Sequence, residues 1–136
     1  MCVSRLFGAV IIMLALPVGA HSAEFDGATP FVCVPVEIAS CASGSECSAE
    51  SAQSINLPQF LRVNASESAI TGKRPDGETL STPIQTRQVL NGRLVLQGTQ
   101  NGLSWTMSVD ADNGDMTVVA AGDKVAFMAF GACLRP

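Results

Sequence analysis

The side chains in this sequence with the widest chemical range are the cysteines, because a thiol can form a disulfide, bind a metal or act as a nucleophile. Cys2 stands near the start, and the others are Cys33, Cys41, Cys47 and Cys133. The stretch CASGSEC, which holds two of them, lacks the CxxC spacing of a redox pair. We therefore predict structural disulfides among the last four cysteines.

Four cysteines permit three pairings. We favour Cys41 with Cys47, across a short polar loop, and Cys33 with Cys133, which would join the first expected strand to the last. On the chain-entropy model the long bridge would stabilise the fold by roughly 4 to 5 kcal/mol and the short bridge by roughly 2 kcal/mol.

Most catalytic chemistries are excluded by what the chain lacks. His21 is the only histidine, and it stands in an N-terminal region that we expect to be removed or frayed. Without an imidazole, a Ser-His-acid or Cys-His site has no base, and a zinc site has lost its usual nitrogen ligand. No glycine-rich phosphate loop of a standard spacing occurs. We therefore expect neither an enzyme nor a cofactor.

Acidic side chains leave two alternatives, a calcium loop and a catalytic pair of carboxylates. DADNGD brings Asp110, Asp112 and Asp115 together, but its glycine comes one residue early for an EF-hand, and Ala121 stands where the bidentate Glu belongs. We interpret it as an acidic hairpin turn without a metal. Two carboxylates can hydrolyse a glycoside, so a carboxylate-dependent hydrolase remains an alternative, although the spacing of the twelve acids singles out no pair.

Trp105 is the only tryptophan, and the chain has no tyrosine. Its indole ring either fills the core or forms a stacking wall in a ligand cavity, and it is our candidate ligand-binding residue. The cationic side chains in the middle of the chain are scattered and form no stripe: Arg62, Lys73, Arg74, Arg87 and Arg93.

The elements that would position these residues are short strands. Three Asn-Gly pairs, beginning at Asn91, Asn101 and Asn113, divide the second half of the chain. Both residue types tolerate the positive φ that two-residue hairpin turns require. Between the last two pairs, apolar and polar residues alternate from 103 to 109, which predicts a half-buried antiparallel strand with Trp105 on its apolar face.

Strands are expected about every ten residues, at 31–38, 58–64, 68–71, 80–89, 93–98, 103–109, 115–121 and 124–134. Pro35 cannot donate to a ladder and indicates an edge or a bulge. Residues 49–54 could form one helical turn at most, and 72–78 read as an exposed loop. The pattern predicts an all-β fold, an antiparallel meander of about eight strands in a disulfide-stabilised small barrel or sandwich. Such a barrel is filled by side chains or holds one small ligand.

Residues 1–23 have the order of a secretory signal peptide: Arg5, then an uncharged run of eleven residues, then small residues. The run is too short to cross roughly 30 Å of hydrocarbon. Cleavage within 20–23 would leave a single β domain, 24–136, without a membrane span, in the bacterial periplasm or secreted. Losing one positive charge changes the net charge from −4 to −5, and an acidic chain repels nucleic acid.

The stretches LVLQGTQNGLSWTMSVDADNGDM and VAFMAFGACLRP resemble short exported proteobacterial proteins of unknown function, with FVC at 31–33 and NLPQFLRVN fitting loosely. In size, export and disulfide-bonded β architecture the chain is also similar to the periplasmic inhibitors of c-type lysozyme, which are small eight-stranded barrels. The inhibitory loop of that family carries a Ser-Gly…Tyr signature, and this chain has no tyrosine. The resemblance therefore implies an architecture and transfers no inhibitory residue.

Two functions from different classes follow from the sequence. The first is an exported β-barrel that binds an unknown protein or a small apolar ligand and catalyses nothing. The second is a periplasmic lysozyme inhibitor, for which the acidic charge would favour a cationic enzyme; it predicts loss of lysozyme turnover on mixing. A filled interior around Trp105 would favour surface interaction, and an unfilled one would favour a ligand.

Overall fold

The computed structural model describes residues 24–136, so the expected signal peptide, 1–23, and His21 lie outside the described residues. Within residues 24–136 the chain forms ten β-strands and no helix. No helix in that range is therefore long and apolar enough to span a membrane. The expected all-β fold is confirmed, with two more strands than the approximate count from the sequence.

The strands are β1 (Phe31–Ala42), β2 (Ser48–Glu50), β3 (Leu61–Asn64), β4 (Ala69–Lys73), β5 (Thr79–Pro83), β6 (Thr86–Leu90), β7 (Arg93–Gln100), β8 (Leu103–Asp110), β9 (Asp115–Gly122) and β10 (Val125–Leu134).

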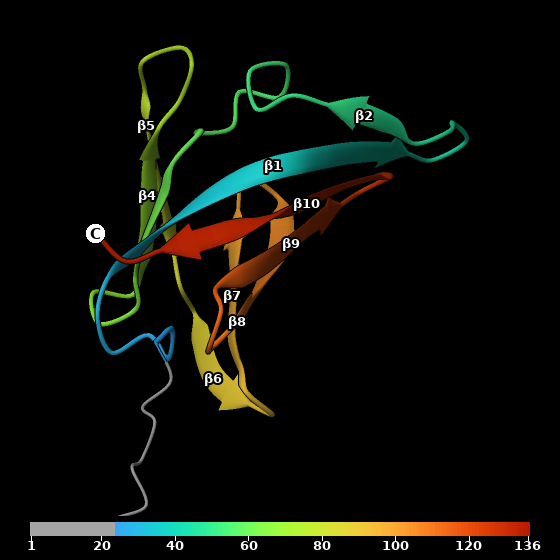
Figure 1. Ribbon diagram of the computed structural model, residues 1–136. Helices are drawn as coiled ribbons and strands as arrows, with labels where there is room; N and C mark the ends of the chain where they lie inside the picture. Colours follow the sequence, from blue (N-terminus) through green and yellow to red (C-terminus); the bar gives the residue numbers. More distant parts are fainter. Residues whose placement is uncertain (1–23) are drawn as a thin grey trace, which may run out of the picture.

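These strands form one antiparallel sheet that curls into a half-barrel (Figure 1). They neighbour one another in the order β5-β4-β3-β1-β10-β9-β8-β7-β6. The first long strand and the last lie side by side, as the blue-green and red arrows show (Figure 1). On its other side β1 pairs with β3 through residues 31–33 and with β2 through residues 38–40. The meander thus returns to its beginning, and the two chain-terminal strands share one ladder.

The expected strand at 80–89 is in fact two strands, because the chain changes partner in its middle. β5 pairs with β4 and β6 pairs with β7, and between them lie Ile84 and Gln85. The Ile84 amide donates to the carbonyl of Ser68, and the Gln85 amide donates to the carbonyl of Gln97, both at 2.8 Å. Ile84 and Gln85 therefore connect β5 and β6, which stand at the two ends of the strand order. Alternation along the sequence does not reveal such a change of partner.

Two of the three Asn-Gly pairs form the expected tight hairpin turns. Asn91 and Gly92 have φ of 49° and 74°, and Asn101 and Gly102 have φ of 50° and 80°. Positive φ at both central residues matches the twist of the flanking strands. These turns fix the register of β6 with β7 and of β7 with β8.

The third pair closes a longer turn between β8 and β9. Of this pair Gly114 has a positive φ, 81°. The Asp110 carboxylate accepts hydrogen bonds from the amides of Asp112 and Asn113, at 3.0 and 3.1 Å. These donors, that of Asn113 first, hold the pKa of Asp110 below its ordinary value. The acidic stretch is thus a turn built around one carboxylate, as the sequence indicated.

Pro35 lies at a β-bulge, one of its two predicted roles. The register of β1 against β10 shifts between Pro35 and Glu37, and the extra residue, Val36, is 70% exposed. Gly131 faces this point, and a Cβ there would lie 2.0 Å from the carbonyl oxygen of Val34. A bulge increases local twist, which agrees with the two halves of β1 pairing with different strands. Because β1 has partners on both sides, it is no edge strand.

Both favoured disulfides are present. Cys33 and Cys133 lie directly opposite each other in the β1–β10 ladder, with Cα atoms 3.9 Å apart. Cys41 and Cys47 close the loop between β1 and β2. The first bridge joins strands that are 100 residues apart in sequence, so it locks the closure of the meander.

The packed core occupies the end of the half-barrel where the N-terminal segment crosses it. Leu94 and Val109 are fully buried there. Phe25 donates its amide to the carbonyl of Ala111 at 2.8 Å and packs edge-to-face on Phe31, with ring centroids 5.5 Å apart. The segment before β1 therefore plugs this end of the interior.

The segment 49–54 contains no helix, which is within the expected limit of one helical turn. Ala49 belongs to β2, and residues 52–56 form turns without a helix. Ser51 and Ser54 exchange side-chain to backbone hydrogen bonds at 3.0 Å in both directions. Serine side chains that satisfy nearby amides compete with helical backbone bonding, which explains why the turn does not become helical.

Candidate ligand-binding site

Cross-strand register sets the inward-facing residues of β8, β9 and β10 in rows across the concave side of the sheet. Trp105 lies opposite Ala120, and Ala120 lies opposite Phe127. The next row consists of Met107, Val118, Ala129 and Ile38. Ala120 therefore lies beside the indole, at a position where a larger side chain would fill the interior. The small side chain leaves space above this row of residues.

Trp105 is held in place from two sides. Its indole Nε1 donates to the hydroxyl of Thr82 on β5 at 3.0 Å, and the side chain is 8% exposed. Gly98 lies opposite Trp105 on β7, where a Cβ would come within 2.5 Å of the indole Cζ2 and 2.4 Å of the carbonyl oxygen of Pro83. The lack of a side chain at Gly98 thus allows β5, β7 and the ring to meet closely.

A cavity of about 280 Å³ lies against Trp105. Its walls are mostly apolar side chains from seven strands and from the segment 55–58, among them Leu61, Ile70 and Leu80. Ligand pockets typically measure about 300 to 1,000 Å³, and this cavity, just below that range, has room for one small molecule. The interior around Trp105 is therefore not filled by side chains.

The lid, which we define as residues 51–58, covers part of this cavity. Ile55, Leu57 and Pro58 contribute apolar side chains to the lining. The lid follows β2 directly, so the position of β2 determines where the lid begins.

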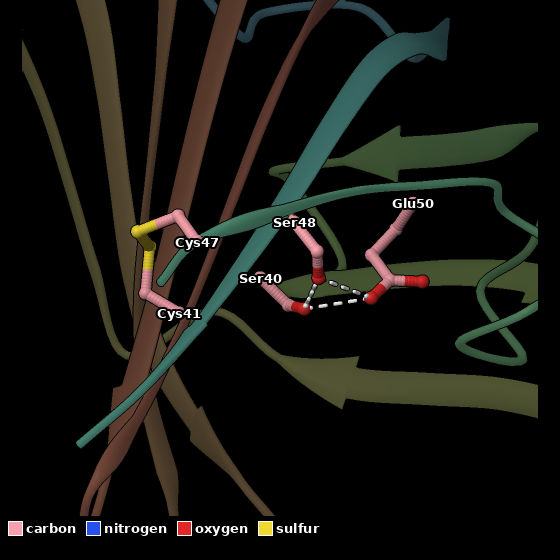
Figure 2. Close-up of a disulfide and its surroundings, with 5 residues drawn as sticks. All are labelled: Ser40, Cys41, Cys47, Ser48 and Glu50. Atoms are coloured by element: carbon pink, nitrogen blue, oxygen red, sulfur yellow. Dashed lines mark hydrogen bonds between the residues drawn. A yellow bond between two sulfur atoms is a disulfide. The ribbon is translucent and has the colours of Figure 1, made fainter. Parts of the chain in front are cut away.

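A carboxylate fixes the start of the lid. Glu50 Oε1 accepts hydrogen bonds from the hydroxyls of Ser40 at 2.7 Å and Ser48 at 3.2 Å, beside the disulfide of this loop (Figure 2). Its Oε2 accepts from the hydroxyl of Ser54, within the lid, at 2.7 Å. These three donors, that of Ser54 first, hold the pKa of Glu50 below its ordinary value. We call Glu50 with these three serines the Glu50 cluster.

Four polar residues of the lining are partly or fully exposed, and we call them the polar rim: Asn56, Arg74, Gln100 and Asn101. Asn56 donates through its side-chain nitrogen to Asp76 Oδ2 at 2.7 Å, which ties the lid to the β4–β5 loop. The pKa of Asp76 is lowered, first by the Glu78 amide and then by Asn56. Arg74 lines the cavity, and its buried Nε has no hydrogen-bond partner in the described part of the chain.

The residues singled out from the sequence lie in four separate places. Trp105 lines the cavity, the disulfides lie in the β1–β10 ladder and at the β1–β2 loop, and Asp110, Asp112 and Asp115 lie at the turn after β8. Within residues 24–136 no three His, Cys, Asp or Glu side chains lie close enough together to hold a metal ion.

Sequence reasoning missed Thr82, Asn56 and Arg74 as parts of the site. The sequence placed Arg74 only among scattered cations in an exposed loop. No local pattern marks these residues, because each reaches the cavity through the pairing of distant strands or through a loop contact. A buried threonine in an alternating strand was the one available signal, since a buried hydroxyl requires a partner.

No family model, curated protein or solved structure matches this chain.

Proposed function

We propose that this protein is an exported binding protein that holds one small apolar molecule in the cavity beside Trp105 and does not catalyse a reaction on it. The observation that supports the proposal is the cavity itself, which is about 280 Å³ in volume and mostly apolar in lining. Binding of an apolar molecule in such a cavity is favourable, because it removes apolar surface from water. Each Å² of buried apolar surface contributes about 25 cal/mol.

The chemistry of the lining supports binding over catalysis. Its polar members are the rim residues and Thr82, and none of the lining side chains is an Asp, Glu, His, Cys, Ser or Lys. General acid–base catalysis needs a side chain that gains or loses a proton near neutral pH. A hydrolase that uses two carboxylates would need both of them beside its substrate.

The proposed location is the periplasm or the medium outside the cell. Two disulfides are typical of an oxidising compartment, and the order of residues in 1–23 is that of a secretory signal. Mass spectrometry of the exported protein tests this: we expect a mature start within residues 21–24, and an intact Met1 would contradict it.

Trp105 provides the assay for binding, because it is the only tryptophan in a chain without tyrosine. Titration with decanol should change the fluorescence of the indole saturably if the alcohol enters the cavity. The test variant is Ala120→Phe, which places a ring in the space opposite Trp105. Its matched control is Ala121→Phe, on the exposed face of the same strand.

We expect saturable binding to the wild type and to Ala121→Phe, and at least a tenfold loss in Ala120→Phe, because a filled cavity offers no room. Far-ultraviolet circular dichroism checks that both variants keep their sheet. Absence of saturable binding to the wild-type protein, or equal binding by the two variants, would refute the cavity as the binding site.

A further inference from the structure

We propose that the molecule held in this cavity is a monocarboxylic acid with a single apolar chain of medium length, and that Arg74 binds its carboxylate at the polar rim. This assignment rests on the proposed binding function and names the chemical class of the ligand. It is carried by a cation, the one charged side chain in the mostly apolar lining of the cavity.

The guanidinium of Arg74 has unused hydrogen-bonding capacity. Its Nε is buried and has no partner within residues 24–136. A buried N–H without an acceptor destabilises the folded protein, and such groups are rare in native proteins. The Nε is enclosed by protein atoms, so a ligand would supply its acceptor only after the Arg74 side chain turned toward the cavity. The unpaired donor then favours an oxygen-bearing head group.

Neighbouring acids do not already neutralise Arg74 by a close ion pair. The ion pair found within residues 24–136 joins Arg93 and Asp110, with a nitrogen–oxygen distance of 3.7 Å, at another part of the sheet. Asp76 is near enough to feel the charge of Arg74. Its two carboxylate oxygens instead accept from the Glu78 amide at 2.9 Å and from the side chain of Asn56 at 2.7 Å.

The charge of the site favours a head group with one negative charge. Arginine is always charged in proteins, and its planar fork fits a carboxylate or a phosphate. Here one guanidinium stands near the negative charge of Asp76. A phosphate monoester carries about −1.5 to −2 at pH 7 and would be repelled more strongly than a carboxylate. The positive charge of Arg74 beside the negative charge of Asp76 therefore favours a head group with a single negative charge.

The volume favours one chain of medium length. About 280 Å³ lies just below the range for ligand pockets, about 300 to 1,000 Å³. Strand β8 by itself contributes three apolar side chains to the lining, those of Leu103, Trp105 and Met107. A single alkyl chain attached to the carboxylate can contact this lining while its head stays at the rim.

The test compares three probes that share a ten-carbon chain: decanoate, decanol and decyl phosphate. Their dissociation constants for the full mature protein at pH 7 are read from the fluorescence of Trp105. We expect decanoate to bind about 10- to 100-fold more tightly than decanol, because hydrogen bonds to a charged group are worth about 1.5 to 3 kcal/mol and tenfold corresponds to about 1.4 kcal/mol. Decyl phosphate should bind less tightly than decanoate.

The variant Arg74→Gln should lose this preference for decanoate over decanol. Arg62→Gln is the matched control, since it removes the same charge from an exposed position of β3 that does not line the cavity. Thermal unfolding verifies that both variants are folded, and the comparison of probes on the wild type needs no variant at all.

The outcomes separate the two proposals. Equal affinity of the wild type for decanoate and decanol, an unchanged preference in Arg74→Gln, or tighter binding of decyl phosphate than of decanoate each overturns the assignment of a monocarboxylate while leaving the cavity as a binding site. Saturable binding of none of the three probes overturns the binding function and this assignment together.

Discussion

At the scale of single residues, the interior is organised by one hydrogen bond and one missing side chain. The indole of Trp105 reaches Thr82 on β5, and the absence of a Cβ at Gly98 lets the ring lie over β7. The hydrogen bond joins β8 to β5, and the close approach at Gly98 also brings β7 against the carbonyl oxygen of Pro83 on β5. Strands that are far apart in the strand order are thus held together. Trp105 is thus a structural tie as well as a wall of the cavity.

The substitution Thr82→Val should destabilise the protein by about 1 to 3 kcal/mol, because the buried indole N–H loses its acceptor while the volume stays similar. Urea unfolding at equilibrium measures the change. Thr79→Val, at an exposed position of the same strand, should stay within about 0.5 kcal/mol of the wild type. Equal effects of the two substitutions would show that the hydrogen bond does not stabilise the fold.

Gly98→Ala should cost about 1 to 3 kcal/mol, because a methyl group at 2.5 Å from the indole carbon forces the ring or the strand to move. The same movement should change the emission spectrum of Trp105, which gives a second readout. Thr99→Ala, at an exposed neighbouring position, serves as the control and should leave the spectrum unchanged. An unshifted spectrum in Gly98→Ala would contradict the close contact.

At the scale of elements, the lid depends on its attachments at both ends. The Glu50 cluster holds its beginning, and the contact of Asn56 with Asp76 ties its later part to the β4–β5 loop. Both carboxylates have a lowered pKa because they accept hydrogen bonds in the folded protein. The lid should therefore be held in place while both carboxyl groups are ionised, and it should loosen when they become protonated.

The pH dependence of the lid follows from the direction of these shifts. A carboxyl whose folded pKa is lowered stabilises the fold above its ordinary pKa, and this contribution is lost as the pH falls through the folded value. We expect the amides of residues 51–57 to lose hydrogen-exchange protection, relative to those of β8, as the pH falls below the ordinary value of 4.5 for Glu50. The exchange rates are first corrected for the intrinsic effect of pH.

Glu50→Ala should loosen the same amides already at neutral pH, since the carboxylate that links Ser40 and Ser48 to Ser54 of the lid is removed. Glu46→Ala is the control, because Glu46 is exposed in the loop between β1 and β2. If both variants showed the same protection in residues 51–57, the Glu50 cluster would have no part in holding the lid.

At the scale of the whole molecule, a curled sheet must keep its first and last strands together. The β1–β10 ladder and the Cys33–Cys133 bridge do this on one side, and the bent segment at Ile84 and Gln85 connects the other. One end of the interior is closed by Phe25, which packs against Phe31. The cavity persists because the sheet is fixed around it.

Removal of the two disulfides should have unequal effects. The pair of substitutions Cys33→Ala and Cys133→Ala should cost about 4 to 5 kcal/mol, and the pair at Cys41 and Cys47 about 2 kcal/mol, because the longer closed loop restricts the unfolded chain more. Urea unfolding of the two double variants measures the difference. A larger loss from the short bridge would contradict this account.

The sequence by itself determined the class of fold, the sequence positions of most strands and both disulfides. Asn91-Gly92 and Asn101-Gly102 specify tight turns through their backbone conformation, and the alternation around Trp105 specifies which face is inward. These are local properties of the chain, so periodicity and turn chemistry reveal them.

Only the tertiary structure decided that a cavity exists and which residues meet in it. Ala120 faces Trp105 because of register, Thr82 reaches the indole because the sheet curls, and Arg74 lines the cavity through a loop that the sequence shows only as exposed. Register and curvature arise from pairings between distant strands. A single sequence carries no local trace of such pairings, so the site could not be read from it.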